Sequence, residues 1–373
     1  MQNKLLIVCG LISCPVLAQN QPQIVVYGSV DQYIGYIHSS SGVSVTGIND
    51  GAVMRSRVGF RGAEDLGGGY QATFTLEQGL FANTGSTADT SRLFDRQAWV
   101  GMNTPVGEFR LGRQNSLALL AGSQLDYTER TTYGSVVNNL GVPSRYDNDI
   151  SYKSPRMAGF QVETHFALSE TAGESLGKRG IYQLGLDYIN GNYRAGYTGL
   201  WAKPAATGTF QDKVIFHYLY GNHDYGQGKI YLAYARTNNV TSNANGQNTG
   251  SILNNISIPS NAFGGNDPNV QRTYNLYQIS ADYRLKPQWR IGALYGVIRD
   301  TSGGNAGTKG GNVGAYYDMS KRTTLYGFVN YMKNETNAGF RFGGSGAPTA
   351  NLKGSDINGQ SLIGLQTGIL HRF

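Results

Sequence analysis

The sequence predicts an all-β fold, a single antiparallel barrel of 16 strands that crosses a membrane. Three observations lead to this prediction. Apolar and polar residues alternate with a period of two along the chain, short turns alternate with long loops, and no later apolar run reaches the length of a membrane-spanning helix. The composition agrees, because 52 Gly and 25 Tyr in 373 residues suit many short strands joined by glycine turns.

The N-terminus has the pattern of a secretory signal peptide over residues 1–18. A lysine near the start precedes an apolar core from Leu5 to Ser13, and the small residue Ala18 stands before a polar stretch. Cleavage after Ala18 would leave residues 19–373 as one barrel domain without any cysteine, and therefore without a disulfide. The alternative interpretation is a lipoprotein cleavage site with a lipidated Cys14.

Alternation is clear in the segment GIYQLGLDYI. Leu184, Leu186 and Tyr188 share one face, and Gln183 and Asp187 lie on the other. Because the number of strands is even, both ends of the barrel domain are expected on the periplasmic side. The expected strands cover residues 23–37, 53–64, 70–81, 94–102, 107–113, 146–154, 159–168, 180–189, 193–203, 211–221, 229–237, 271–285, 288–300, 311–319, 322–334 and 359–373.

The connections divide into two kinds. Turns such as NGN and KPQ are short, whereas the Gly-, Ser- and Asn-rich loops between them are long, as in outer-membrane barrels. The segment Gln114–Arg145 is too long for a hairpin turn and is less regular than its neighbours, which indicates a function.

A soluble or adhesive β-sandwich is the alternative fold. Aromatic residues near strand ends and a last strand that ends flush with the chain argue against it.

Several function classes are disfavoured. The net charge is only +7 and the basic residues are scattered, whereas a nucleic-acid-binding protein would gather them in one patch. The sequence has no P-loop, no G-x-S-x-G elbow, no HExxH and no EF-hand spacing, so we expect no enzyme, no cofactor and no metal site. His165 lies on a polar strand face and is interpreted as wall lining rather than as a catalytic residue.

The last strand, QSLIGLQTGILHRF, ends on Phe373 and resembles the signal with which outer-membrane proteins are recognised for insertion. From Val25 to Phe373 the chain resembles the general porins of β-proteobacteria and Neisseria. The matching stretches are VVYGSVD, SRVGFRGAEDLGGGYQATFTLEQGLF, DRQAWVGM, GEFRLGRQ and RYDNDISYKSPRMAGF.

The resemblance implies a diffusion porin in the outer membrane of a Gram-negative bacterium, a water-filled channel for ions and small hydrophilic solutes. It also implies a homotrimer that is surrounded by outer-membrane lipid and is inserted by the outer-membrane machinery through the C-terminal strand. A substrate-specific channel on the same barrel is the alternative. The long loop departs from some relatives, because its apex lacks a Pro-Glu-Phe-Gly-like segment.

The resemblance further implies that the third long loop, Gln114–Arg145, folds into the lumen and sets the constriction. Within it, NSLALLAGSQL is expected to form a short helix with its apolar side on the wall. Strand parity supplies inward charges, for instance Arg57 if Phe60 faces lipid, and Arg96 if Trp99 faces lipid. The expected constriction residues are Arg57, Glu77, Arg96, Arg113 and Arg145 on the wall, and Asp126 and Glu129 on the loop.

The arginines in this set outnumber the carboxylates, which predicts a preference for small anions. Arginine stays protonated at any relevant pH, so the preference is not expected to titrate near neutrality. The alternative interpretation is that some of these arginines only brace the wall by pairing with Glu77 or Asp147.

Overall fold

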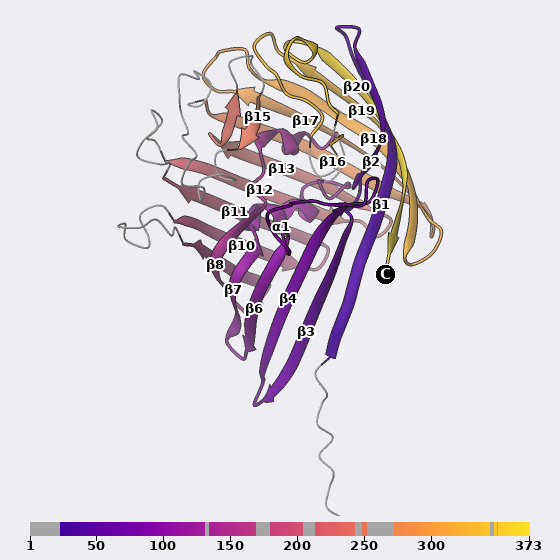
Figure 1. Ribbon diagram of the computed structural model, residues 1–373. Helices are drawn as coiled ribbons and strands as arrows, with labels where there is room; N and C mark the ends of the chain where they lie inside the picture. Colours follow the sequence, from indigo (N-terminus) through magenta and orange to yellow (C-terminus); the bar gives the residue numbers. More distant parts are fainter. Residues whose placement is uncertain are drawn as a thin grey trace, which may run out of the picture.

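The structure, a computed structural model, describes residues 23–130, 134–168, 180–203, 213–242, 248–251, 272–343, 347–348 and 350–373. The expected signal peptide, residues 1–18, lies outside this part. Sixteen strands pair in a closed, fully antiparallel barrel (Figure 1). They are β1 (Gln23–Ser39), β3 (Arg57–Gly67), β4 (Tyr70–Phe81), β6 (Gln97–Thr104), β7 (Gly107–Asn115), β8 (Arg145–Lys153), β9 (Phe160–Ala167), β10 (Ile181–Asn190), β11 (Tyr193–Ala202), β12 (Val214–Asp224), β13 (Lys229–Thr237), β16 (Tyr274–Lys286), β17 (Trp289–Asp300), β18 (Thr308–Asp318), β19 (Thr323–Asn334) and β20 (Ser361–Arg372).

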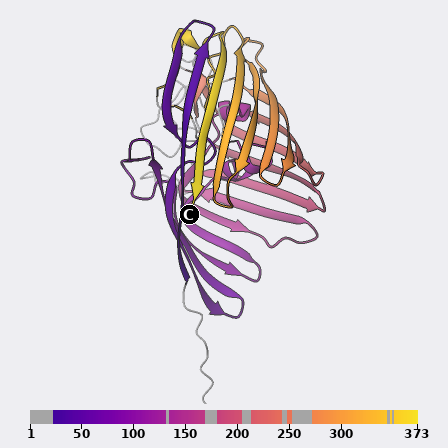
Figure 2. The same cartoon turned by 90° about the vertical axis from the view of Figure 1, so that its right-hand side faces the viewer.

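The two ends of the barrel domain close the ring. β1 pairs with β20 from Ser29↔Arg372 to Ser39↔Leu362, and the two strands lie side by side in Figure 2. The backbones of Gly28 and Phe373 exchange two hydrogen bonds of 3.1 Å. A Cβ at Gly28 would lie 2.4 Å from the Phe373 ring, so the seam requires glycine there.

The second strand position is divided, which the sequence did not predict. β2 (Ser44–Asp50) pairs with one half of β1, and β3 pairs with the other half. Residues 51–56 between them leave the sheet because Asp31 holds them: its Oδ2 accepts hydrogen bonds of 2.7 Å from the backbone N–H groups of Val53 and Met54. The strand expected over 53–64 therefore begins only at Arg57.

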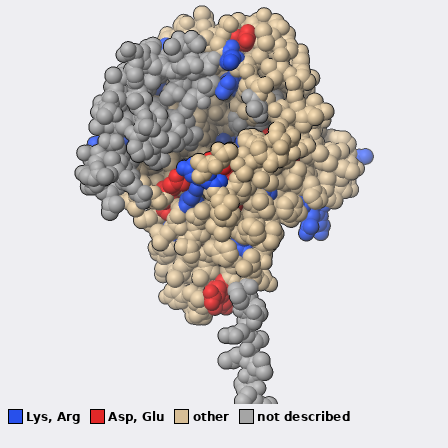
Figure 3. Space-filling view, viewed as in Figure 1, with Lys and Arg blue, Asp and Glu red and all other residues tan. Residues whose placement is uncertain are grey.

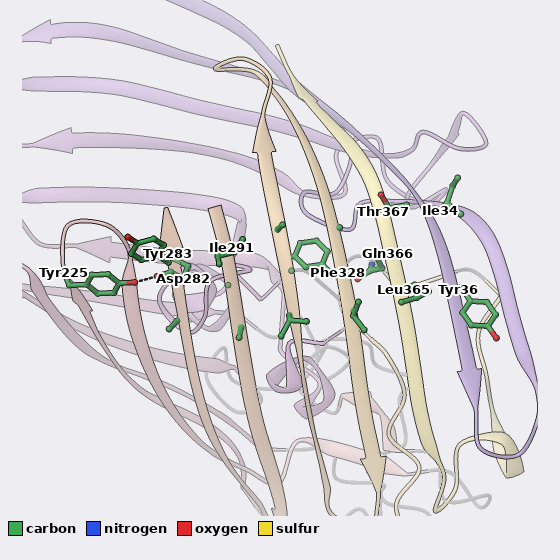
Figure 4. Close-up of a pocket in the computed structure, with 18 residues that line it drawn as sticks. Ile34, Tyr36, Tyr225, Asp282, Tyr283, Ile291, Phe328, Leu365, Gln366 and Thr367 are labelled. Carbon is green, nitrogen blue, oxygen red and sulfur yellow. Dashed lines mark hydrogen bonds between the residues drawn. The ribbon is translucent and has the colours of Figure 1, made fainter. Parts of the chain in front are cut away.

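The outer wall is apolar and the inner wall is polar. On β16, Tyr277 and Ile279 are 49% and 52% exposed, whereas Gln278 and Ser280 are buried. Small outward residues of β16–β20 leave a furrow of 990 Å³ on the outer wall, flanked by side chains such as Ile34 and Leu365 (Figure 4). This alternation, apolar outside and polar inside, is the pattern of a membrane barrel.

Short helices occur between β7 and β8, namely α1 (Leu117–Leu120), η1 (Ala121–Gln124) and η2 (Val136–Leu140). Ser116 caps α1, because its Oγ accepts a hydrogen bond from the backbone N–H of Leu119 at 3.1 Å. The remaining elements are β5 (Ser86–Thr87), the hairpin of β14 (Val240–Ser242) and β15 (Asn248–Ser251), and η3 (Gly354–Asp356). No helix in the described part of the chain is long and apolar enough to cross a membrane.

Candidate functional site

A buried carboxylate, Glu77, lies at the centre of a charged cluster on the wall. Gly59 pairs with Glu77 and Phe60 pairs with Leu76, so the 38%-exposed Phe60 faces out and Glu77 faces in. Oε1 of Glu77 accepts a 2.6 Å hydrogen bond from Nε of Arg96. Its Oε2 accepts one of 3.0 Å from the hydroxyl of Tyr27 and lies 3.7 Å from Nη1 of Arg57.

Arg145, at the start of β8, adds a third guanidinium group to this cluster. Arg57, Glu77 and Arg96 all act electrostatically on it. Among the described residues no carboxylate lies within ion-pair distance of Arg145, and its buried Nε has no hydrogen-bond partner. One carboxylate therefore faces three guanidinium groups, and the cluster is positive overall.

A second group of ion pairs connects Arg92, in the loop before β6, and Arg113, on β7, to Asp147 on β8. Asp147 binds Nη1 of Arg113 at 2.6 Å and Nη2 of Arg92 at 3.0 Å. Hydrogen bonds from Ser91 and Arg92 lower the pKa of Asp89, in the same loop, to about 2. Arg113 pairs with Asp147 as Arg96 pairs with Glu77, so both show the ion pairing that the alternative interpretation expects. Figure 3 shows charged side chains of both signs gathered where this face of the molecule is hollowed.

Comparison with known proteins decides the family. A family model described as Gram-negative porin matches residues 5–337. The chain belongs to the Gram-negative porin family. An outer membrane porin protein of Bordetella pertussis is 29% identical over 359 residues, which cover 85% of this chain and 90% of that protein. Outer membrane porin protein 32 of Delftia acidovorans is 26% identical over 390 residues, with 99% of both chains covered.

Solved structures agree on the fold. The anion-selective porin from Comamonas acidovorans superimposes with a TM-score of 0.75 at 24% identity, over 95% of this chain and 100% of that one. The trimer form of OmpT from Vibrio cholerae gives a TM-score of 0.61 at 15% identity, over 94% of this chain and 99% of that one. With the family model and the two relatives, the chain is an outer-membrane diffusion porin, a channel for ions and small hydrophilic solutes.

The prediction that Trp99 of the porin faces lipid is wrong. Trp99 pairs with Thr75 and so shares the inner face with Glu77, while Val100 is 58% exposed on the outer face. The guanidinium of Arg110 lies 4.2 Å from the Trp99 ring centre. Arg96 nevertheless reaches Glu77, because it precedes β6, where the chain bends and strand parity does not apply.

Asp126 binds residues of its own loop and of β16. It is fully buried. Its Oδ2 accepts hydrogen bonds from Oγ of Ser135 at 2.6 Å and Nε2 of Gln278 at 3.0 Å, so it fastens the long loop to β16. These partners satisfy the hydrogen-bonding capacity of the buried carboxylate. The expected place of Asp126 at the constriction stays a prediction.

Glu129 lies apart from the Glu77 cluster as well. It lines a small hollow with Arg290 and Tyr316, on β17 and β18, and forms no ion pair among the described residues. Two structural features were not predicted from the sequence. One is Arg290, whose guanidinium lies over the Tyr316 ring at 4.1 Å, and the other is the Asp31 anchor. Neither has a local sequence signal, because both depend on partners on distant strands.

Proposed function

We propose that this porin prefers anions and that its eyelet lies between the Glu77 cluster and residues 116–130 and 134–144, which fold into the lumen. The observation that carries the proposal is the charge of the cluster. Arg57, Arg96 and Arg145 surround a single carboxylate, Glu77, on the inner wall. A positive ring at a narrow passage lowers the free energy of a passing anion and raises that of a cation.

Contacts across the barrel support the position of the loop. The backbone N–H of Leu117 donates to Oε1 of Gln183 on β10 at 2.9 Å. The hydroxyl of Tyr127 donates to Oδ1 of Asn312 on β18 at 2.6 Å. The Tyr127 ring also occupies the space over Gly292 on β17, where a Cβ would lie 2.3 Å from it. Figure 1 draws α1 within the ring of strands.

We extend the proposal to the assembly of the porin in the outer membrane. We infer a homotrimer in outer-membrane lipid, inserted by the outer-membrane machinery through the strand that ends at Phe373. The trimer form of OmpT supports the oligomeric state, and the terminal ring seated on Gly28 supports a role for Phe373 in closing the barrel. A trimer that dissociates on heating in a denaturing gel is the expected result, and a monomer without heating contradicts it.

Charge reversal tests the eyelet. The double variant Arg57→Glu, Arg96→Glu converts two guanidinium groups to carboxylates, so the zero-current potential under a KCl gradient should move toward that of a cation-selective channel. Because Arg96 is buried against Glu77, the single variant Arg57→Glu is the better-folded companion and should move the potential in the same direction. Unchanged selectivity in folded protein would refute the proposed eyelet.

A further inference from the structure

We propose that this porin has a second solute site, which binds small carboxylates with an apolar body between α1 and the inner wall of β9–β11. The proposal rests on the proposed channel function and adds a substrate class to it. The site is a cavity of 240 Å³. It lies near the turn between β8 and β9, and short turns of outer-membrane barrels face the periplasm. Its lining includes Leu117, Leu120, Lys153, Glu163, Asp187 and Arg194.

One side of the cavity is apolar. Leu117 and Ala121 are buried, but Leu120 is 44% exposed although it belongs to a segment fastened to the wall. α1 approaches β10 closely at Gly185, where a Cβ would lie 3.3 Å from Leu117. An exposed leucine beside charged wall residues is available to cover the apolar part of a solute.

The facing wall carries excess positive charge at Asp187. Oδ1 of Asp187 accepts hydrogen bonds from Nε of Arg194 at 2.7 Å and from the hydroxyl of Tyr220 at 2.8 Å. Its Oδ2 accepts one of 2.5 Å from Nη2 of Arg156. Two guanidinium groups thus share one carboxylate. Within the described chain Arg194 donates through Nε alone, and its side chain is 32% exposed, so its terminal N–H groups are open to a ligand.

Lys153 provides a second open cation. Its Nζ lies 3.6 Å from Oε2 of Glu163, which is a loose pair, and its side chain is 38% exposed. Oε1 of the same carboxylate is 3.2 Å from Nε2 of His165. Glu163 is therefore divided between two partners, and the ammonium group of Lys153 can turn toward a solute.

These groups define the ligand. A carboxylate would accept hydrogen bonds from Arg194 and Lys153, and an apolar body would rest on Leu120. Chloride and acetate lack the apolar body, and neutral alcohols lack the charge. The binding should be weak, because a conducting channel must release what it holds. Benzoate has both parts and serves as the probe.

The test is current block in planar bilayers. Benzoate added to the wild-type porin in KCl should reduce the current at concentrations at which acetate and benzyl alcohol do not, with a lower half-blocking concentration from the periplasmic side. Arg194→Gln should raise the half-blocking concentration by about tenfold or more, the factor expected for one hydrogen bond between charged groups. Leu120→Ser should raise it by about fivefold, the factor expected for one apolar contact.

Arg236→Gln is the matched control, because Arg236 is an exposed arginine on β13 and does not line the cavity. It should leave the block at its wild-type value. The site is disproved if acetate blocks as well as benzoate, or if both cavity variants keep the wild-type half-blocking concentration while retaining heat-modifiable gel mobility. The zero-current potential in KCl alone, measured in the same membranes, tests the eyelet separately, because the cavity lies apart from the Glu77 cluster.

Discussion

Replacing Arg57 with glutamine should weaken the anion preference of the porin. Arg57 is the more exposed of the two arginines paired with Glu77, with 21% of its side chain exposed against 9% for Arg96. Its pair distance is also longer, 3.7 Å against 2.6 Å. The charge of Arg57 is therefore less neutralised and closer to passing ions. Glutamine keeps most of the side-chain volume and removes the charge, together with the 3.0 Å hydrogen bond from Nε of Arg57 to the backbone oxygen of Arg55.

The expected size follows from Coulomb's law. A unit charge about 6 Å from an ion contributes about 0.7 kcal/mol at the dielectric constant of water. Screening at physiological ionic strength roughly halves this value. Because the effect has opposite signs for chloride and potassium, the permeability ratio should fall about threefold at 0.15 M salt, and by less than about twofold at 1 M salt.

Zero-current potentials under KCl gradients at low and high mean salt measure both values. Lys309→Gln, which removes an exposed charge near the opposite end of the chain on β18, is the control and should leave the ratio unchanged. Two results would refute the reasoning. One is an unchanged ratio in a variant with wild-type heat-modifiable mobility, and the other is a change that is as large at 1 M salt as at 0.15 M.

Three further predictions concern other parts of the barrel. Asp31→Ala should increase current noise and lower stability by roughly 3 kcal/mol, because two partly buried N–H groups lose their charged acceptor; quiet channels and an unchanged thermal midpoint would contradict it. The pKa of Asp89 is lowered to about 2, so its pairing with Arg92 is complete above about pH 4 and is lost only as the pH falls toward 2; the carboxyl chemical shift of Asp89 should therefore be constant from pH 8 to pH 5, and a drift would count against it. Gly28→Val should reduce the yield of heat-modifiable barrel because its side chain meets Phe373, and wild-type refolding yield would show that the seam tolerates it.

The strands could be predicted because membrane and lumen impose a period of two on nearly every one of them. Sixteen expected segments correspond to the sixteen strands of the ring, with ends that differ by a few residues. The failure at the second strand has a specific cause. Residues 51–56 leave the sheet because Asp31 binds their backbone, and an aspartate on a polar strand face gives no local sign of that role.

The site was predicted in part. Arg57 and Arg96 both bind Glu77, and Arg145 acts electrostatically on the same cluster. Strand parity accounts for Arg57, whereas Arg96 reaches Glu77 from the bend before β6. Strand parity failed where hydrophobicity was its only guide. Trp99 pairs with Thr75 and faces inward, where Arg110 stacks on its ring.

The loop carboxylates could not be oriented from the sequence. Whether Asp126 faces the lumen or fastens the loop depends on Gln278, which lies 152 positions further along the chain. The sequence shows an acid in a long loop but not the side chain that receives it. Such pairings come from tertiary structure, and only the three-dimensional arrangement separates a bracing carboxylate from one that lines the channel.

The most direct test of the central claim is the zero-current potential of the wild-type porin under a KCl gradient in planar bilayers. A positive eyelet formed by Arg57, Arg96 and Arg145 predicts a potential with the sign set by chloride, larger at low salt than at high salt. A potential with the sign set by potassium would contradict it.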